Sequence, residues 1–282
     1  MFKNKLDIII TSFLRPQALE DLLQSIYDYN PQLLDYITIG IQSKEKVENY
    51  KINGKEIKVI HQPWDCGLSY ARNNLVKNTE REYILLLEDD FLFNSGTDIE
   101  RMIFLLENNK DIGVVGGMVS EMGIEFNFNH RFELEEGGKR LRQVGDGDEW
   151  RSVDYYLGGK KITYKETGCV LNFAMFRRKI FQNHGWSNNQ KLAEHTDFYY
   201  RWIKNIPNYK IVFCPDVKID TLHTHSKGDY RVYKSRHLKY MKKFMKKNNL
   251  THYIYREGFC YYLNPIDDKL YQTRENRDGK IL

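Results

Sequence analysis

The chain has 282 residues, the size of one large domain or of a domain with an appendage. Hydrophobic residues make up 41% and aromatic residues 14%, so the chain can bury enough apolar surface to exclude disorder over most of its length. The net charge of +5 is too small to indicate nucleic acid binding without a basic patch, and we expect no nucleic-acid partner.

The first half of the chain alternates strand and helix patterns. Apolar runs typical of strands buried on both faces lie at 6–13, 35–43, 56–63, 82–93 and 111–119. Apolar residues at helical spacing predict helices that begin at Pro16 and that cover 68–78 and 99–109. Strands separated by helices of ~10–15 residues indicate a parallel sheet with helices on its faces.

The second half of the chain has a different pattern. Gly137-Gly138 and Gly158-Gly159 lie between runs of alternating polar and apolar residues, which predicts hairpins or a flexible flap over 122–165. The elements predicted after it are a strand, a helix, a strand and a basic helix, at 168–176, 195–205, 210–219 and 230–249.

The cysteines and the N-terminus bear on the cellular setting. The four cysteines are far apart and form no C-x-x-C pair, so a reducing compartment is the simplest setting. Asp7 interrupts the first apolar run and no small-residue cleavage site follows, so we expect no signal peptide. No stretch approaches the ~18 apolar residues that a spanning helix needs. We therefore expect a cytoplasmic protein.

Three consecutive acidic residues, Glu88, Asp89 and Asp90, directly follow the apolar run 83–87. Ligands bind at the carboxyl ends of the strands in a parallel α/β sheet. Adjacent carboxylates repel one another and are costly to desolvate, so the cluster needs a cation or solvent. A hard divalent metal that bridges to phosphate oxygens would supply that charge. The alternative is a solvated acidic turn.

A glycine turn opens a helix within residues 65–73. A helix N-terminus offers free N–H groups to an anion, and Arg72 adds donors suited to a diphosphate or a base edge. Asp65 and Arg72 are therefore candidates for binding a nucleotide. The alternative is an ordinary capped helix with a surface arginine.

Three segments together resemble the glycosyltransferases of the GT-A fold, in particular the family 2 type. They are IIITSFLRPQALEDLLQSI at 8–26, GLSYARN at 67–73 and LLLEDDFLF at 85–93. The chain is most similar to the subgroup that includes the ganglioside N-acetylgalactosaminyltransferases. The resemblance covers roughly residues 5–95, and weaker matches extend to about residue 230.

The resemblance implies a metal site of the D-x-D type. Asp90 is then the metal ligand, and Asp89 and Glu88 contact the ribose of the nucleotide or the water shell of the metal. In metal-dependent members a histidine supplies the last ligand, and the segment that matches places His225 there. One imidazole in an oxygen-rich site favours Mn²⁺, with Mg²⁺ as the alternative cofactor. A pair of surface or core histidines, His223 and His225, is the other interpretation.

The resemblance also implies a nucleotide-sugar donor, with UDP as the nucleotide. The loop after the first strand holds the base and ribose in such enzymes, which implies Thr11, Phe13 and Arg15. Arg72 would reach the uracil or the diphosphate. The acidic residue that usually reads the uracil is replaced by Gln42, whose amide can still pair with a base edge.

The segment 193–201 resembles the part of the family that supplies the catalytic base. His195 stands where the family has its catalytic aspartate, with Glu194 before it and Asp197 after it. Imidazole is a competent general base near neutral pH, whereas Glu194 is the closer chemical substitute for aspartate. We rank Glu194 and His195 equally and Asp197 third. The alternative is a helix start with acids near its positive end.

Three further features have two interpretations each. Gly116-Gly117 ends a predicted strand, where Gly117 would let the backbone approach a sugar. Trp186 is either a platform on which the acceptor stacks or a buried core residue. The basic helix 230–249 either contacts a membrane surface peripherally or packs by its apolar face with its lysines in water, and we favour the second.

These patterns together predict an α/β protein of the GT-A type, with a mixed, mostly parallel sheet flanked by helices. We expect a glycosyltransferase domain over 1–230, divided into a nucleotide-binding half (1–100) and an acceptor half (101–230), and a C-terminal helical appendage over 231–282. The predicted function is the metal-dependent transfer of a sugar from a nucleotide-sugar, with a UDP-sugar as the expected donor, to a hydroxyl of a glycan or glycolipid acceptor, with inversion.

Two other classes of function remain open at this point. A nucleotidyl- or phosphotransferase could use the same carboxylates, although it would usually add a glycine-rich phosphate loop with a lysine, which this sequence lacks. A sugar-binding module without catalysis is the third class, but it would be expected to lose the acidic cluster. The setting we expect is bacterial polysaccharide or glycan assembly on the cytoplasmic side of the membrane.

Overall fold

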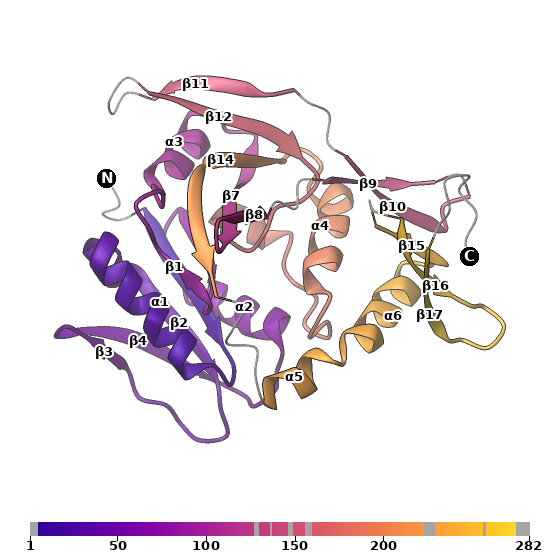
Figure 1. The fold of residues 1–282 in the computed structure, drawn as a ribbon, viewed down its shortest axis with the longest axis horizontal. Helices are drawn as coiled ribbons and strands as arrows, with labels where there is room; N and C mark the ends of the chain where they lie inside the picture. The colour runs from indigo at the N-terminus through magenta and orange to yellow at the C-terminus, as the bar shows by residue number, and fades with distance from the viewer. Residues whose placement is uncertain are drawn as a thin grey trace.

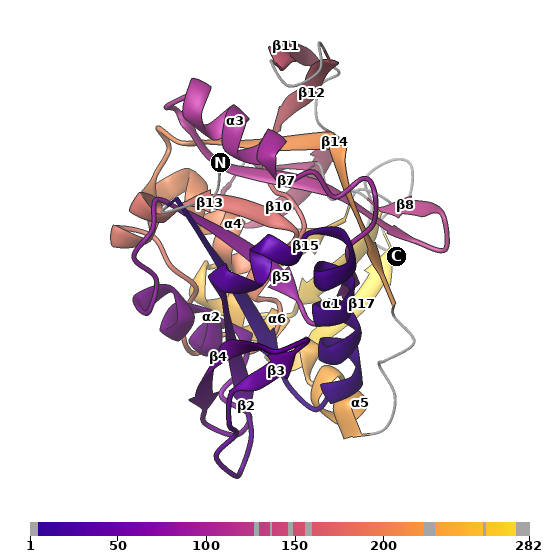
Figure 2. The same cartoon turned by 90° about the vertical axis from the view of Figure 1, so that its left-hand side faces the viewer.

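The computed structural model describes residues 5–126, 130–135, 137–145, 149–155, 160–222, 229–255 and 258–274. Within these residues the strands form two sheets, a larger one of twelve strands and a smaller one of five. Figure 1 shows the smaller sheet at the right of the molecule, and Figure 2 shows the same fold after a quarter turn. The predicted α/β class with a mixed central sheet and flanking helices is confirmed.

The larger sheet has both parallel and antiparallel pairs. Its strands in spatial order are β11 (Arg151–Tyr155), β12 (Lys160–Thr167), β14 (Lys210–Thr221), β7 (Ile112–Glu121), β13 (Ala174–Arg177), β5 (Tyr83–Glu88), β1 (Leu6–Ser12), β2 (Ile37–Gln42), β4 (Lys55–Gln62) and β3 (Tyr50–Ile52). Two short strands lie off this path, β6 (Phe91–Leu92) beside β14 and β8 (Ile124–Phe126) beside β7.

Parallel pairing is less extensive than the sequence predicted. Strands β5, β1, β2 and β4 are parallel, as is the pair β7 and β14. Strand β13 lies between β5 and β7 and is antiparallel to both. The reason is topological. Strands β5 and β7 are not adjacent in the sheet, and β13, which comes later in the chain, occupies the position between them in the opposite direction.

Helices cover both faces of the larger sheet, as the alternation of side chains along a strand requires. Ile8 and Ile10 of β1 share a core with helices α1 (Pro16–Tyr29) and α3 (Glu100–Asn108). Ile9 points to the other face, into a core with α2 (Leu68–Lys77) and α4 (Glu194–Asn205). Two 3₁₀ helices, η1 (Pro31–Tyr36) and η2 (Arg178–Gln182), complete the connections.

The second sheet joins the middle of the chain to its end. Its order is β17 (Leu270–Arg274), β16 (Phe259–Leu263), β15 (His252–Ile254), β10 (Arg140–Gly145) and β9 (His130–Leu134). Helix α6 (His237–Lys247) packs between this sheet and α4, in a core that includes Tyr200, Phe244 and Tyr253. The predicted appendage over 231–282 is therefore not purely helical, because it also contains three strands, the first of which, β15, pairs with β10, more than 100 residues earlier.

Three predicted elements differ in detail from the structure. The predicted strand 82–93 is interrupted at Asp89-Asp90, which form a turn between β5 and β6. The predicted helix 230–249 consists of α5 (Asp229–Lys234) and α6, separated at residues 235–236. Within 122–165, hairpins are confirmed, because β7 pairs with β8, β9 with β10 and β11 with β12, each antiparallel.

Candidate functional site

The three acidic residues lie at the carboxyl end of β5, in the middle of the larger sheet. Asp89 is fully buried and Asp90 is 6% exposed, whereas the Glu88 side chain is partly exposed. The Asp90 carbonyl oxygen accepts a hydrogen bond from the Leu222 amide at 3.0 Å, which holds the turn against the end of β14. The apolar run ends here because the strand ends here, and the next two residues, Asp89 and Asp90, form a turn.

Arg15 neutralises the two buried carboxylates. It lies in the loop between β1 and α1, donates from Nη1 to Asp90 Oδ2 at 2.5 Å and from Nη2 to Asp89 Oδ1. Burial raises the pKa of Asp89 to about 7 and also raises the pKa of Asp90, while the Arg15 cation opposes both shifts. The guanidinium lies 4.6 Å from the centre of the Tyr230 ring. Arg15 thus forms an ion pair with the acidic turn, and its predicted contact with a nucleotide stays a prediction.

The free oxygens of the acidic turn fit a hard cation. Asp89 Oδ2 and Asp90 Oδ1 are buried and accept no hydrogen bond within the part of the chain that the structure describes. Carboxylate oxygens of this kind are ligands for Mg²⁺ and Mn²⁺, with water and phosphate completing the shell. Among the described residues, no group of three or more His, Cys, Asp or Glu side chains converges on one point. His225, the other predicted ligand, lies outside the described residues.

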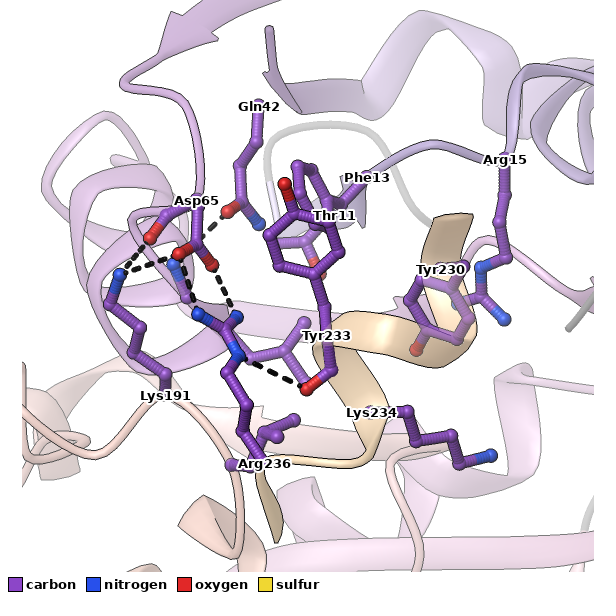
Figure 3. A pocket seen from close by; sticks show the side chains of 13 residues that line it. Thr11, Phe13, Arg15, Gln42, Asp65, Lys191, Tyr230, Tyr233, Lys234 and Arg236 are labelled. Atoms are coloured by element: carbon purple, nitrogen blue, oxygen red, sulfur yellow. Dashed lines mark hydrogen bonds and ion pairs between the residues drawn. The ribbon is translucent and has the colours of Figure 1, made fainter. Parts of the chain in front are cut away.

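Five predicted nucleotide-binding residues come together in one pocket, here called the strand-end pocket (Figure 3). They come from the ends of β1, β2 and β4 and the loops that follow, and they are Thr11, Phe13, Arg15, Gln42 and Asp65. This convergence follows from parallel pairing, which brings the carboxyl ends of neighbouring strands to one edge. The prediction that these residues share a site is consistent with the structure, while their ligand stays a prediction.

Helix α5 and the residues around it form the other wall of the strand-end pocket, which the sequence did not predict. Tyr233 contacts Phe13 edge to face, with ring centres 4.8 Å apart. Arg236 donates two hydrogen bonds to the Asp65 carboxylate, at 2.7 and 2.8 Å, and Lys191 donates to the same group at 3.1 Å. The remaining volume is about 40 Å³, well below the ~300 Å³ of small ligand sites, because these side chains fill the pocket (Figure 3).

Gln42 has a local structural partner. Its Oε1 accepts a hydrogen bond from the Gly67 amide at 3.0 Å, and the side chain is buried. Gly67 has φ of +85°, and a Cβ there would lie 2.5 Å from Lys191 Cγ, so only glycine fits the turn that begins α2. The amide group of Gln42 therefore holds this turn, in addition to lining the pocket.

Arg72 does not line the strand-end pocket, so its predicted contact with a nucleotide stays a prediction that this geometry does not support. Its side chain is fully buried behind the acidic cluster. Nη1 donates to Glu194 Oε1 at 2.9 Å, and Nη2 donates to Glu88 Oε1 at 3.3 Å. Helix α2 begins at Leu68 and places Arg72 one turn inside, facing the sheet. Arg72 therefore joins the carboxyl end of β5 to the first residue of α4.

Glu194 and His195 line a larger cavity, here called the α4 cavity, with a volume of about 420 Å³. Burial raises the pKa of Glu194, opposed by the charge of Arg72. Burial, and then the same arginine, lower the pKa of His195 to about 3, so its imidazole is neutral near pH 7. His195 Nδ1 lies 3.3 Å from Asn172 Oδ1. Both candidate bases therefore line the α4 cavity, Glu194 with a raised pKa and His195 as a neutral imidazole.

Asp197, the third candidate base, points away from this cavity. It is 1% exposed and accepts hydrogen bonds from Ser187 Oγ at 2.5 Å, Arg201 Nε at 2.8 Å and Lys247 Nζ at 3.2 Å. Burial alone would raise its pKa, but the hydrogen bond from Ser187 and the Arg201 cation lower it overall. Proximity in sequence was misleading, because two helical steps of about 100° place Asp197 on the side of α4 opposite His195. Asp197 ties α4 to α6.

We expect Asp197→Asn to lower the free energy of unfolding by roughly 2–4 kcal/mol, because two cations lose their partner in a buried cluster. The folded-state pKa lies below the unfolded value, so this loss should be full above pH ~3.9 and shrink as the pH falls further. Urea unfolding across pH measures it. Asp111→Asn, which breaks an exposed pair with Lys210, is the control and should cost about 1 kcal/mol or less. Unchanged stability would contradict the structural role.

Two other predicted site residues lie in the core. Trp186 is 5% exposed and stacks on Phe198, with ring centres 4.7 Å apart. Of its two interpretations, the structure agrees with that of a buried core residue. Gly117 lies in the middle of β7, and a Cβ there would meet the Phe173 ring at 2.4 Å. Both positions are explained by packing, which the sequence pattern could not distinguish from contact with a sugar.

Three lysines of α6 form ion pairs within the protein. Lys246 and Lys242 pair with Asp268, and Lys247 pairs with Asp197. The apolar side of this helix is buried in the core shared with the smaller sheet. This arrangement agrees with the interpretation we favoured, a helix packed by its apolar face, while contact with a membrane stays a prediction. None of the described helices is long and apolar enough to cross a membrane.

Comparison with known proteins settles the family. The model of the family described as "Glycosyl transferase family 2" matches residues 7–185, more than half of the chain. The chain belongs to glycosyl transferase family 2. This match includes β1, the acidic turn and the strand-end pocket as far as Asp65, and it confirms the resemblance seen in the sequence.

The family 2 chain has relatives among characterised proteins. It is 29% identical over 218 residues to mouse (Mus musculus) beta-1,4 N-acetylgalactosaminyltransferase 2, and the aligned region covers 77% of this chain and 39% of the relative. It is 26% identical over 218 residues to human (Homo sapiens) beta-1,4 N-acetylgalactosaminyltransferase 1, and the aligned region covers 76% of this chain and 38% of that relative. The chain therefore spans about two fifths of the length of these relatives. Both are animal proteins, so they do not support the bacterial setting we expected.

A solved structure shows the same fold. The mannosyltransferase PcManGT from Pyrobaculum calidifontis, in complex with GDP-Man and Mn²⁺, superposes with a TM-score of 0.55 at 12% identity. The match covers 88% of this chain and 64% of that protein. At this identity the likeness concerns the fold alone.

Proposed function

We propose that this chain transfers a sugar from a nucleotide-sugar, with UDP-sugars as the favoured donors, to a hydroxyl group of a glycan acceptor. The reaction is divalent-metal-dependent and inverts the anomeric configuration. The observation that supports it best is the continuity of the cavities. A third space, lined by Glu88 and Asp90, shares Leu68, Tyr230 and Lys234 with both the strand-end pocket and the α4 cavity. The carboxylates thus lie between the strand-end pocket and the α4 cavity.

The donor is proposed to bind with its nucleotide in the strand-end pocket. Phe13 supplies an aromatic edge and Thr11 a hydroxyl at the carboxyl ends of parallel strands, where nucleotides bind in α/β folds. The side chains of α5 must shift to admit a nucleotide, because they leave only about 40 Å³. Lys234 lines all three spaces and is placed to neutralise the diphosphate.

Asp90 and Asp89 would hold the divalent metal through the oxygens that have no hydrogen bond within the described residues. When bound, the metal stabilises the negative charge that develops on the leaving diphosphate. Arg15 already donates to the other oxygen of Asp90, so it keeps this carboxylate oriented in the absence of a cation. The proposal follows from the donor atoms of the described residues, which are carboxylate oxygens.

Glu194 is the favoured base. The acceptor oxygen attacks the anomeric carbon, the bond from that carbon to the diphosphate oxygen breaks, and the acceptor proton passes to Glu194. Arg72 Nη1 donates to Glu194 Oε1 at 2.9 Å and so fixes the carboxylate, which lines the α4 cavity. His195, with its pKa lowered to about 3, is a weaker base and is better suited to accept or donate a hydrogen bond in its neutral form.

The test is donor hydrolysis and transfer across a panel of UDP-, GDP- and CMP-sugars, with Mn²⁺ and with excess chelator. We expect release of UDP that requires the metal, and transfer to glycan acceptors carrying free hydroxyls. Release of pyrophosphate from nucleoside triphosphates would indicate a nucleotidyltransferase instead. No turnover of any donor, with binding of free sugars retained, would indicate a sugar-binding module and would overturn the proposal.

A further inference from the structure

The smaller sheet forms one wall of the α4 cavity, opposite the candidate base. Phe132 of β9 and Gln143 of β10 line this cavity together with His130. His130 and Phe132 are two residues apart on one strand, so their side chains share a face, and Gln143 is the cross-strand partner of Phe132. The rest of the lining includes Glu88 of β5, Glu194 of α4 and Asn172, which precedes β13.

The three side chains on this wall are held in place. The Phe132 ring contacts His130 edge to face at 5.0 Å and Tyr200 at 6.5 Å, measured between ring centres. Gln143 is 6% exposed, and its Nε2 donates to the hydroxyl of Tyr253. Fixed side chains lose little conformational entropy when a ligand binds. This wall is therefore preorganised.

The chemistry of the wall fits one class of ligand. Phe132 is half-buried, so part of its ring faces the cavity, and Gln143 and His130 flank it with planar hydrogen-bonding groups. An uncharged pyranose ring has the complementary form, because its C–H face is apolar and its hydroxyls project from the rim. The volume of about 420 Å³ lies within the ~300–1,000 Å³ of small-molecule sites.

We propose that Phe132, Gln143 and His130 form a subsite for the uncharged pyranose ring of the acceptor that bears the attacked hydroxyl. This inference rests on the proposed function and deepens it, since it assigns acceptor selection to the smaller sheet. A ring stacked on Phe132 is held between the two walls, with its rim toward Glu194. The acceptor half of the site then depends on β10 and β15, which pair across more than 100 residues.

The experiment compares Phe132→Leu, which keeps the apolar bulk, with Phe132→Tyr, which keeps the ring. Probes are methyl β-pyranosides of galactose, glucose, N-acetylglucosamine and N-acetylgalactosamine, assayed as acceptors with the donor that the wild type uses. Phe132→Leu should raise the acceptor KM about 5–10-fold and leave donor hydrolysis by water unchanged, whereas Phe132→Tyr should stay within about 2-fold of wild type. Gln143→Leu should raise the same KM.

Tyr271→Leu, at the far edge of the smaller sheet and 41% exposed, is the matched control and should leave the acceptor KM unchanged. Thermal unfolding of each variant separates misfolding from lost binding. If Phe132→Leu keeps donor hydrolysis and an unchanged acceptor KM, the subsite is wrong although the proposed function stands. If the wild type hydrolyses no nucleotide-sugar at all, the proposed function itself fails. Equal KM changes in Phe132→Leu and Phe132→Tyr would also contradict stacking on the ring.

Discussion

Asp90→Asn is expected to lower glycosyl transfer by about 10²–10³-fold at saturating Mn²⁺, because the amide removes a charged ligand oxygen at the end of β5. The effect acts on the leaving diphosphate, whose negative charge loses its counterion in the transition state. Transfer rates over a Mn²⁺ titration, and with excess chelator, measure it. We expect the variant to stay folded, because Arg15 keeps its ion pair with Asp89 and burial already disfavours the charge of Asp90.

The control for this variant is Asp35→Asn. Asp35 is exposed and pairs with Lys55 on the surface, so the same chemical change there should leave transfer unchanged. Full activity in Asp90→Asn would show that the metal assignment is wrong. Undiminished turnover of the wild type in excess chelator would show that no divalent metal is needed, whichever residue holds the diphosphate.

Glu194→Gln is expected to lower kcat by about 10²–10⁴-fold with little change in donor affinity, because a general base acts in the transition state. Glutamine keeps the hydrogen-bonding shape and can still accept from Arg72 through its oxygen. Stopped assays give kcat, and calorimetry with UDP gives donor affinity. His195→Gln should have the smaller effect, since the imidazole contacts Asn172 and its pKa is too low for an efficient base.

The pH dependence separates the two residues. A base works when it is deprotonated, so activity falls as the pH drops through its pKa. Burial raises the pKa of Glu194 above its usual 4.5, which places the acidic limb of kcat/KM above that value. With His195 as the base, its pKa of about 3 would leave the profile flat down to about pH 4.

The matched control is Glu20→Gln on the exposed side of α1, which should leave both kcat and the pH profile unchanged. A larger loss in His195→Gln than in Glu194→Gln would assign the base to the imidazole. Near-native kcat in both variants would place the base outside the first turn of α4. A loss of donor affinity equal to the loss of kcat would mean that Glu194 acts on the donor rather than on the acceptor.

The sequence by itself determined the elements whose residues interact locally. Apolar runs defined β1 and β5, and Pro16 with leucines at helical spacing defined α1. Parallel pairing then required the acidic turn and the loop after β1 to lie at one edge of the sheet. The family resemblance had implied Thr11, Phe13 and Gln42 as nucleotide-binding residues, and these three line one pocket at this edge.

Tertiary structure alone decided what depends on contacts between distant segments. The pairing of β10 with β15, the bridge from Arg72 to Glu88 and Glu194, and the burial of Trp186 each join residues far apart in the chain. Local periodicity carries no information about such pairs, because the same pattern is satisfied by any partner surface of matching polarity. Asp197, in the first turn of α4, is a further example. Its hydrogen bonds with Ser187, Arg201 and Lys247 give this carboxylate a structural role that its position in the sequence did not indicate.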